Sequence, residues 1–158
     1  MALGSYSAIQ TRGVGGMIIS MIAKRMGRSS FDIMSQDHID TDALLKVYAD
    51  DCTYGGTSDS GVEATVKGKK AITEWLRNWE KEFPKRRFEV KNIAFAAWPL
   101  MPTNVCLIDW NLTEVNREGR EFRYSGYSVC HMKNFKMVRG HDYMVSRGPS
   151  SDLNHETE

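Results

Sequence analysis

The stretch from Asn104 to Val145 constrains the fold more than any other part of the chain. Three runs rich in Val, Tyr, Phe, Trp, Thr and Cys are separated by short breaks at Asn116–Gly119 and Lys133–Phe135. Aromatic and β-branched residues favour strands, and breaks of turn length join strands that are neighbours in an antiparallel sheet. The stretch therefore predicts a three-stranded antiparallel meander.

Two acidic residues, Asp109 and Asp142, lie inside this meander. Asp is rare within strands and costly to bury without a partner, so each acid requires a reason. A two-residue first turn and a three-residue second turn would place both acids opposite Gly126, on one face of the sheet. A glycine within a strand often marks a place where a ligand comes close. We therefore expect the two carboxyl groups to flank Gly126, with no side chain between them. A second turn of two or four residues would instead turn Asp142 to the other face of the sheet.

Such a pair suits acid–base chemistry. Two nearby carboxyl groups push their pKa values apart, so that one donates a proton at neutral pH while the other accepts one. Asp109 and Asp142 are thus the candidate general acid and base, and Tyr54 would orient a water or a substrate oxygen. The alternatives are that one acid is bonded to backbone or Arg, and that Tyr54 is a core residue with its hydroxyl at the rim.

Composition narrows the possible partners and compartments. The chain has 158 residues, of which 41% are apolar, so we expect one domain with one core. Lys and Arg number 21 against 20 acids, and this balance favours neither nucleic acid nor a membrane surface. Cys52, Cys106 and Cys130 lie in apolar strand patterns without metal-type spacing, which indicates buried free thiols, a cytoplasmic location and no metal site.

The N-terminal half is expected to be mostly helical. Residues 1–16 are glycine-rich and predict a flexible leader. Apolar spacing predicts helices over 17–37, from a cap at Thr41 to about Asp50, and over Lys69–Phe83. The remaining segments are a strand at Cys52–Tyr54, a glycine-rich loop at Gly55–Gly61, a solvated basic turn at Lys85–Arg87, a strand at Phe88–Trp98 and a loop at Pro99–Thr103.

This order predicts an α+β domain over residues 17–146, with helices on one face of the sheet and a polar tail at 147–158. The apolar side of the strand around Trp110 could be core, with Asp109 outside, or a dimer surface, with Asp109 in a cavity. We prefer the second interpretation, because an exposed apolar strip usually marks a protein contact. A homodimer through this face is therefore expected.

The order of elements resembles a known superfamily. Two helices, the segment YADDCTY, a glycine-rich loop, the helix VKGKKAITEWL and the terminal KMVRGHDYM resemble the SnoaL-like branch of the ketosteroid isomerase and nuclear-transport-factor superfamily. The resemblance implies a cone-shaped α+β fold in which a strongly curved, mostly antiparallel sheet packs on about three N-terminal helices and encloses a pocket. It also implies homodimers.

Limonene epoxide hydrolases look closest by motif. Their Tyr-x-Asn falls on Tyr54-Gly55-Gly56, their Arg-x-Asp on Leu107-Ile108-Asp109, and their terminal Asp-Tyr on Asp142-Tyr143. The bridging Arg and the water-holding Asn of those enzymes are absent. SnoaL-type polyketide cyclases also use an acid at the position of Asp142.

The expected function is that of a small-molecule enzyme that uses acid and base carboxylates in a hydrophobic pocket, without a cofactor. Isomerase, dehydratase, cyclase and hydrolase chemistry all fit this description. A small hydrophobic molecule is the expected partner, bound by Leu107, Gly126, Tyr124 and Trp75, with neither nucleic acid nor membrane involved. The alternative is a noncatalytic dimeric ligand-binding or interaction module of the same fold.

Overall fold

The computed structural model describes residues 21, 25, 27–59, 61, 63–96 and 102–147. The expected leader at 1–16 and the tail beyond residue 147 lie outside this range, as does most of the expected first helix before residue 27. No helix in the described part of the chain is long and apolar enough to cross a membrane.

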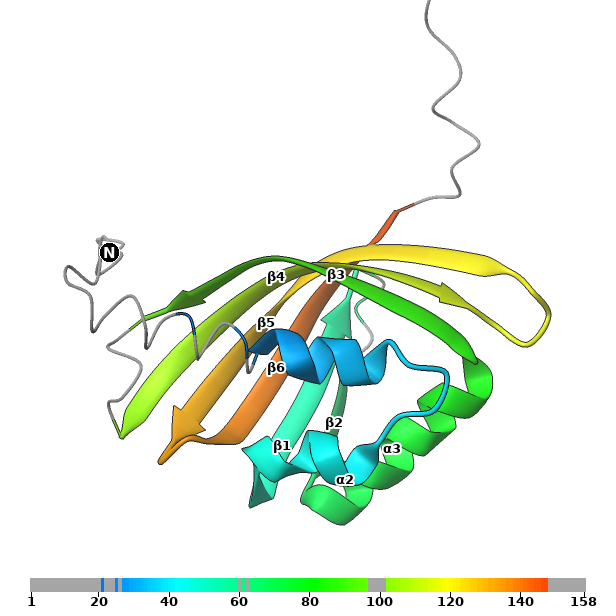
Figure 1. Ribbon diagram of the computed structural model, residues 1–158. Coiled ribbons are helices and arrows are strands. Elements are labelled where there is room, and N and C mark those ends of the chain that lie inside the picture. The colour runs from blue at the N-terminus through cyan, green and yellow to red at the C-terminus, as the bar shows by residue number, and fades with distance from the viewer. Residues whose placement is uncertain are drawn as a thin grey trace, which may run out of the picture.

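A six-stranded sheet forms the body of the molecule, and it arches over the helices on its concave side (Figure 1). The strand order is β2-β1-β6-β5-β4-β3, and every neighbouring pair is antiparallel except β1 and β6. The strands are β1 (Tyr48–Ser58), β2 (Glu63–Lys67), β3 (Lys85–Phe95), β4 (Thr103–Val115), β5 (Glu121–Lys133) and β6 (Lys136–Arg147). The predicted α+β class, with a curved and mostly antiparallel sheet, is confirmed.

The first predicted helix ends at residue 34, before its expected end at 37, and the second is shorter than predicted. A helical segment covers 27–34, followed by α2 (Thr41–Leu44), the 3-10 turn η1 (Leu45–Val47) and α3 (Lys69–Glu82). The N-cap of α2 is Asp40 and not Thr41, because the Asp40 carboxylate accepts a hydrogen bond of 2.9 Å from the Ala43 N–H. The second helix therefore ends before Asp50, and the chain is extended from Tyr48 onward.

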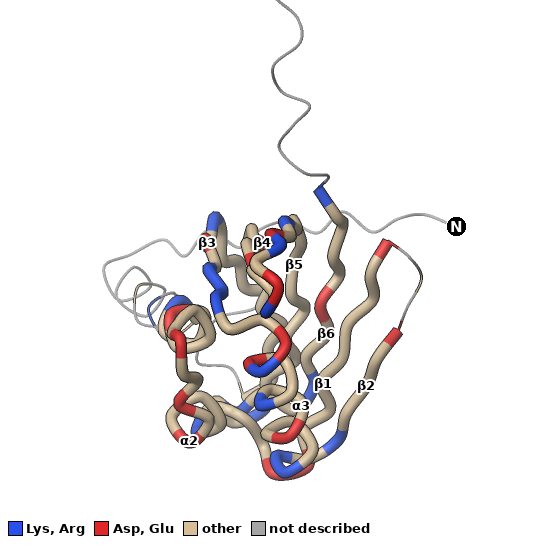
Figure 2. The backbone as a smooth tube through the Cα atoms, turned by 90° about the vertical axis from the view of Figure 1, so that its right-hand side faces the viewer, with Lys and Arg blue, Asp and Glu red and all other residues tan. Residues whose placement is uncertain are grey.

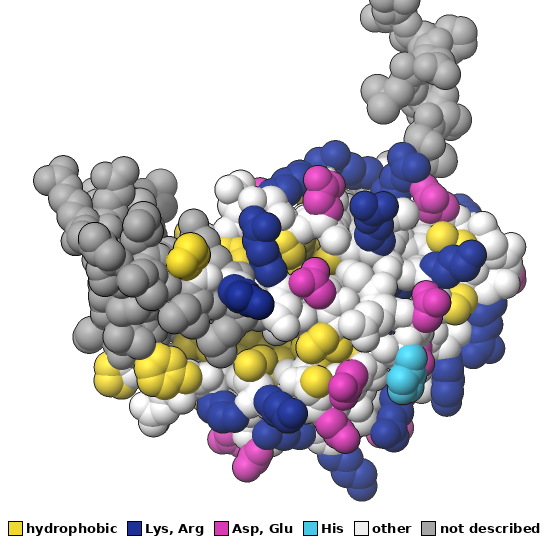
Figure 3. Space-filling model, viewed as in Figure 1, with side chains coloured by type: hydrophobic (Ala, Val, Ile, Leu, Met, Phe, Trp, Pro, Cys, Tyr) yellow, Lys and Arg dark blue, Asp and Glu magenta, His cyan; other side chains and the backbone are white. Residues whose placement is uncertain are grey.

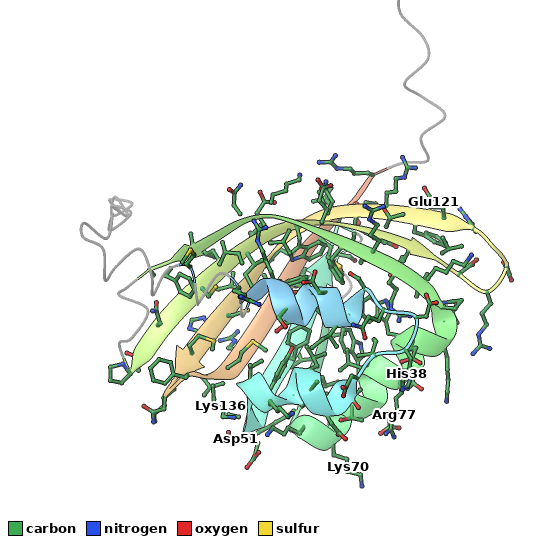
Figure 4. All side chains as sticks on the ribbon, viewed as in Figure 1. His38, Asp51, Lys70, Arg77, Glu121 and Lys136 are labelled. Carbon is green, nitrogen blue, oxygen red and sulfur yellow. The ribbon has the colours of Figure 1, made fainter. Side chains whose placement is uncertain are left out.

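The helix α3 matches its prediction closely. Ile72 and Leu76 are almost completely buried, while the side chains of Trp75 and Trp79 stack with 5.9 Å between ring centroids. This apolar stripe packs toward the concave side of the sheet, as its helical spacing predicts. Charged side chains of the opposite face, such as Lys70 and Arg77, project outward (Figure 4).

The apolar side of β4 is core and not an open surface. The side chains of Cys106, Ile108, Trp110 and Leu112 are all at most 6% exposed. They point toward the helices, so Asp109, which alternates with them, points to the convex side. The predicted dimer surface around Trp110 is therefore wrong, and the alternative interpretation of this strand holds.

The first connection of the meander, residues 116–120, is longer than the predicted two residues. Asn116 holds it, because its side-chain oxygen accepts hydrogen bonds of 3.1 and 2.9 Å from two backbone N–H groups of the loop. The longer loop shifts the pairing by one residue, so that Asp109 lies opposite Tyr127 and not Gly126. A shift of one residue exchanges the two faces of a strand.

The second connection also differs from its prediction. Asn134 and Phe135 form a two-residue turn with φ values of 48° and 62°, typical of tight hairpins. Such a turn alone would send Asp142 to the convex face. Val138 is an extra, unpaired residue in β6, however, and this bulge restores the inward orientation, so that Asp142 lies opposite Ser128.

Arg86 is buried, although the sequence predicts a solvated basic turn there. It is 4% exposed, and its guanidinium donates hydrogen bonds to the backbone carbonyls of Met34, Gln36, Asp37 and Phe83. The guanidinium also lies 5.3 Å from the centre of the Trp79 ring. Arg86 thus ties the chain after the 27–34 helix and the end of α3 to the start of β3.

Candidate active site

A largely apolar cavity of about 140 Å³ lies between the concave face of the sheet and the helical segment 27–34. Hydrophobic side chains also gather below this segment in the space-filling view (Figure 3). The residues that line the cavity are Gly27, Ser30, Phe31, Met34, Val47, Tyr48, Tyr54, Phe95, Asn104, Cys106, Ile108, Ser128, Cys130, Met132, Phe135 and Met137. A cavity of about 150 Å³ with apolar walls holds one benzene molecule, so this one suits a small hydrophobic group.

Four side chains form a hydrogen-bonded chain at one part of the cavity wall. The Tyr54 hydroxyl donates to Asp142 Oδ2 at 2.6 Å, and the Ser128 hydroxyl donates to Asp142 Oδ1 at the same distance. The Trp110 indole N–H donates in turn to Ser128 Oγ at 2.9 Å. Tyr54 and Ser128 line the cavity, whereas Asp142 and Trp110 are not among the lining residues. The carboxyl group therefore lies behind the cavity wall, hydrogen-bonded to two of the residues that line it.

Two glycines make room for the aromatic members of this chain. A Cβ atom at Gly140 would lie 2.6 Å from the Tyr54 ring, and one at Gly126 would lie 2.7 Å from the Trp110 indole. Both distances are below any normal contact. Gly140 lies beside Tyr54 through the parallel pairing of β1 and β6, and Gly126 lies opposite Trp110 through the pairing of β4 and β5. Gly126 thus leaves space for the Trp110 indole and does not lie between two carboxyl groups.

Burial sets the protonation behaviour of the carboxyl group. Loss of solvent raises the pKa of Asp142, while the hydrogen bonds from Ser128 and Tyr54 and the charge of His141 oppose this shift. The pKa of Tyr54 is raised well above its ordinary value, first by burial and then by the negative charge of Asp142. Tyr54 therefore stays protonated through the neutral range, and Asp142 is the acidic group of the pair.

Asp109 and Asp142 lie on opposite faces of the sheet. Asp109 is half-buried on the convex face, where it lines a shallow groove with Tyr127 and Tyr143, whose rings stack at 5.0 Å. The predicted juxtaposition of the two acids on one face is therefore wrong. The acid–base role of Asp142 and the orienting role of Tyr54 remain predictions.

None of the four predicted substrate-binding residues lines this cavity. Leu107 is 44% exposed on the convex face. Trp75 and Tyr124 are partly buried against the core, and Trp75 lies close to the site, with its ring 5.6 Å from that of Tyr54. We therefore do not assign these residues, or Gly126, to substrate binding.

Ser128 and Trp110 are site residues that the sequence analysis missed as such. The period-2 alternation of β5 could have identified Ser128, since it lies two residues before Cys130 and thus on the same face of the strand.

Cys52, Cys106 and Cys130 are buried free thiols, as predicted, and burial raises the pKa of Cys106 to about 12. Among the described residues, no cluster of three or more His, Cys, Asp or Glu could hold a metal ion.

Comparison with known proteins identifies the family. The SnoaL-like domain model matches residues 28–140, which is well over half of the chain. The chain belongs to the SnoaL-like domain family. This membership confirms the predicted resemblance. By sequence, the SnoaL-like chain has no match among curated proteins.

Solved structures of other proteins share the fold of this SnoaL-like domain at low sequence identity. A "putative aromatic ring hydroxylase" from Novosphingobium aromaticivorans has a TM-score of 0.69 and 15% identity over 83% of this chain and 94% of its own. An LEH-like epoxide hydrolase of M. tuberculosis has a TM-score of 0.59 and 13% identity, over 76% of this chain and 80% of its own. A protein with a ketosteroid isomerase-like fold from Catenulispora acidiphila, in complex with trimethylamine, has a TM-score of 0.56 and 13% identity, over 73% of this chain and 82% of its own. At these identities the likeness establishes the fold and no activity.

Proposed function

We propose that this SnoaL-like protein is a cofactor-independent enzyme that transfers a proton on a small hydrophobic substrate. The observation that supports the proposal is a buried carboxyl group, Asp142, joined through the Tyr54 hydroxyl to an apolar cavity. A general base with a raised pKa beside an apolar cavity suits proton abstraction at neutral pH.

The two residues have different roles in this proposal. Tyr54 lines the cavity and would contact the substrate, whereas Asp142 lies behind it. As a substrate proton passes to the Tyr54 oxygen, the Tyr54 hydroxyl proton passes to Asp142, and the electron pair stays on the substrate. The reverse transfer returns the proton to another carbon, which would complete an isomerisation, or to a β-hydroxyl that leaves as water, which would complete a dehydration. We expect this chemistry in the cytoplasm, where the three thiols stay reduced.

The noncatalytic alternative is favoured by one observation, the convex position of Asp109. A two-acid enzyme requires both carboxyl groups at the cavity, whereas a ligand-binding module tolerates one on the opposite face. The cavity side of β4 carries Cys106, Ile108 and Trp110, which are not acids or bases at neutral pH. The proposal therefore depends on Asp142 alone, and a measurement of turnover distinguishes the two functions.

Deuterium exchange tests proton abstraction without knowledge of the natural substrate. Small cyclic ketones and acetophenone are incubated with the protein in D₂O, and NMR follows deuterium entry next to the carbonyl. We expect the wild type to accelerate exchange, and Asp142→Asn and Tyr54→Phe to lose at least about 100-fold of that rate, the lower range for general acid–base catalysis. Asp109→Asn is the matched control and should keep the wild-type rate. Exchange no faster than in buffer, or undiminished in Asp142→Asn, would favour the binding module.

A further inference from the structure

The hydrogen-bonded chain at the cavity wall has only one arrangement of protons when Asp142 is ionised. The Trp110 indole N–H can only donate, so Ser128 Oγ accepts from it and directs its own proton elsewhere. An ionised carboxylate can only accept, so it receives the protons of both Ser128 and Tyr54. Each hydroxyl has a single proton. A ligand in the cavity that reaches either hydroxyl therefore meets only lone pairs.

Adding one proton to Asp142 turns one of these two hydroxyl groups from a hydrogen-bond acceptor into a donor toward the cavity. A proton on Oδ2 is donated to the Tyr54 oxygen, and the Tyr54 hydroxyl proton is then free to point into the cavity. A proton on Oδ1 has the same effect at Ser128, whose oxygen then accepts from both Trp110 and Asp142. In either case the wall gains one hydroxyl donor, although no heavy atom moves.

We propose that the protonation of Asp142 selects the class of ligand that the cavity binds. With Asp142 ionised, the hydroxyl pair accepts a hydrogen bond and favours a neutral ligand with an N–H or O–H donor. With Asp142 protonated, the pair donates a hydrogen bond and favours a carbonyl compound without a donor. The selection uses the same site as the proposed proton transfer but requires no turnover.

Several other titratable groups face Asp142. Tyr48 and Tyr54 approach it from β1 and Cys130 from β5, while His141, its neighbour in β6, lies on the convex face against Tyr143. The tyrosines and the thiol have raised pKa values and stay neutral through the acidic and neutral range. His141 differs from these groups, because a positive charge on its imidazole favours ionised Asp142. The variant His141→Gln therefore isolates the titration of Asp142.

Two pairs of neutral probes test the selection by equilibrium binding between pH 4 and 9. Acetophenone accepts hydrogen bonds but has no donor, and ethylbenzene has the same shape without the oxygen. Indole donates through its N–H, and indene lacks that group. Ligand-observed NMR gives the dissociation constant of each, and the ratio within a pair removes the contribution of apolar contacts.

In the wild type and in His141→Gln, the preference for acetophenone over ethylbenzene should fall about tenfold as pH rises. The preference for indole over indene should rise by a similar factor, as expected when a buried polar group loses or gains its partner. Asn at position 142 has an NH₂ group that donates and a carbonyl oxygen that accepts, and in this it resembles protonated Asp. Asp142→Asn should therefore prefer acetophenone at every pH, while Asp109→Asn keeps the wild-type profile.

Three results would overturn the proposal: ratios that do not change with pH in the wild type, a pH dependence that survives in Asp142→Asn, or no binding of ethylbenzene and indene. The first and third need no variant, so they stand even if Asp142→Asn does not fold. A clear switch of preference without any deuterium exchange of ketones would contradict the proposed enzyme and leave the selection of ligands intact.

Discussion

Gly140 determines where the Tyr54 ring can lie, because a Cβ atom there would be 2.6 Å from that ring. We expect Gly140→Ala to lower the free energy of unfolding by about 1–3 kcal/mol, the usual cost of overpacking, and to displace the Tyr54 hydroxyl from Asp142. Gly56→Ala is the matched control in the neighbouring strand, where the nearest atom would be 3.5 Å away. Urea unfolding measures the free energy of unfolding of both variants. Equal losses in the two variants would show that the space beside Tyr54 does not matter.

The raised pKa of Asp142 makes the stability of the protein depend on pH. The folded state binds this proton more tightly than the unfolded state, in which an Asp titrates at about 3.9. The contribution of Asp142 to stability is therefore fully present below that pH and is lost as pH rises to the folded pKa. Above the folded pKa it stays constant.

Asp142→Asn lacks this titration. The free energy of unfolding of the wild type, minus that of Asp142→Asn, should therefore decrease as pH rises through the window between the two pKa values. Chemical denaturation from pH 3.5 to 8 measures the difference, with Asp109→Asn as a control on the convex face. A difference that increases with pH would mean that the hydrogen bonds from Ser128 and Tyr54 outweigh burial.

At the scale of single residues, the sequence identified which residues belong to the site better than it predicted the face of the sheet on which each one lies. Asp142 and Tyr54 were identified as a strand acid and a strand tyrosine, and they contact one another. Asp109 was identified by the same reasoning and lies on the other face. The difference arises from a single residue of loop length, which Asn116 sets through two hydrogen bonds to the backbone. Asp142 faces inward only because Val138 forms a bulge, which no composition rule predicts.

Among the elements, the joint between the helices and the sheet depends on Arg86. Its guanidinium bonds to four backbone carbonyls and is almost completely buried. We expect Arg86→Met to lower the free energy of unfolding by about 3 kcal/mol, because the carbonyls lose a charged donor and remain buried. Arg87→Met changes the exposed neighbour in the same strand and should have little effect. Urea unfolding of Arg86→Met and Arg87→Met measures the two free energies of unfolding, and a comparable decrease in both variants would contradict this prediction.

Elements with a strong periodic pattern were predictable, and those shaped by glycine were not. The helix α3 has a continuous apolar stripe closed by Pro84, and its boundaries agree with the sequence. The predicted loop at Gly55–Gly61 is instead largely strand, because β1 continues to Ser58. A Cβ atom at Gly55 would lie 2.5 Å from the Ala64 carbonyl oxygen, so glycine permits β1 and β2 to approach closely. Composition alone suggested a flexible loop where glycine serves strand pairing.

For the molecule as a whole, the homodimer remains a prediction, and the structure changes the surface through which we expect it. Leu107, Tyr127, Tyr143 and Val145 are between 40% and 58% exposed. They lie on the convex face and define an apolar outer surface there. Acidic and basic residues are interspersed along the chain (Figure 2), and the net charge is only +1. Two copies therefore repel one another little, and we expect this surface to pair with a second copy.

Sedimentation of the wild type and of Tyr127→Lys tests this association. We expect a dimer at micromolar concentration for the wild type and a monomer for Tyr127→Lys, because a charge at the centre of an apolar contact is costly to desolvate. Glu74→Gln, on the exposed side of α3, changes the net charge by the same amount and should stay dimeric. A monomeric wild type would show that the outer surface has another purpose.

The parallel pairing of β1 with β6 has a consequence during protein synthesis. Tyr54 and Asp142 are 88 residues apart in sequence, and β3, β4 and β5 are all translated between them. Those three strands pair with sequence neighbours and can associate early, whereas β1 and β2 join the sheet only beside β6. The ribosome must therefore release β6 before Tyr54 meets its carboxylate. A nascent chain that stalls between β5 and β6 contains Tyr54 and Ser128 but not Asp142. Under the proposed mechanism such a chain would lack its proton acceptor, and completion of the sheet would also complete the site.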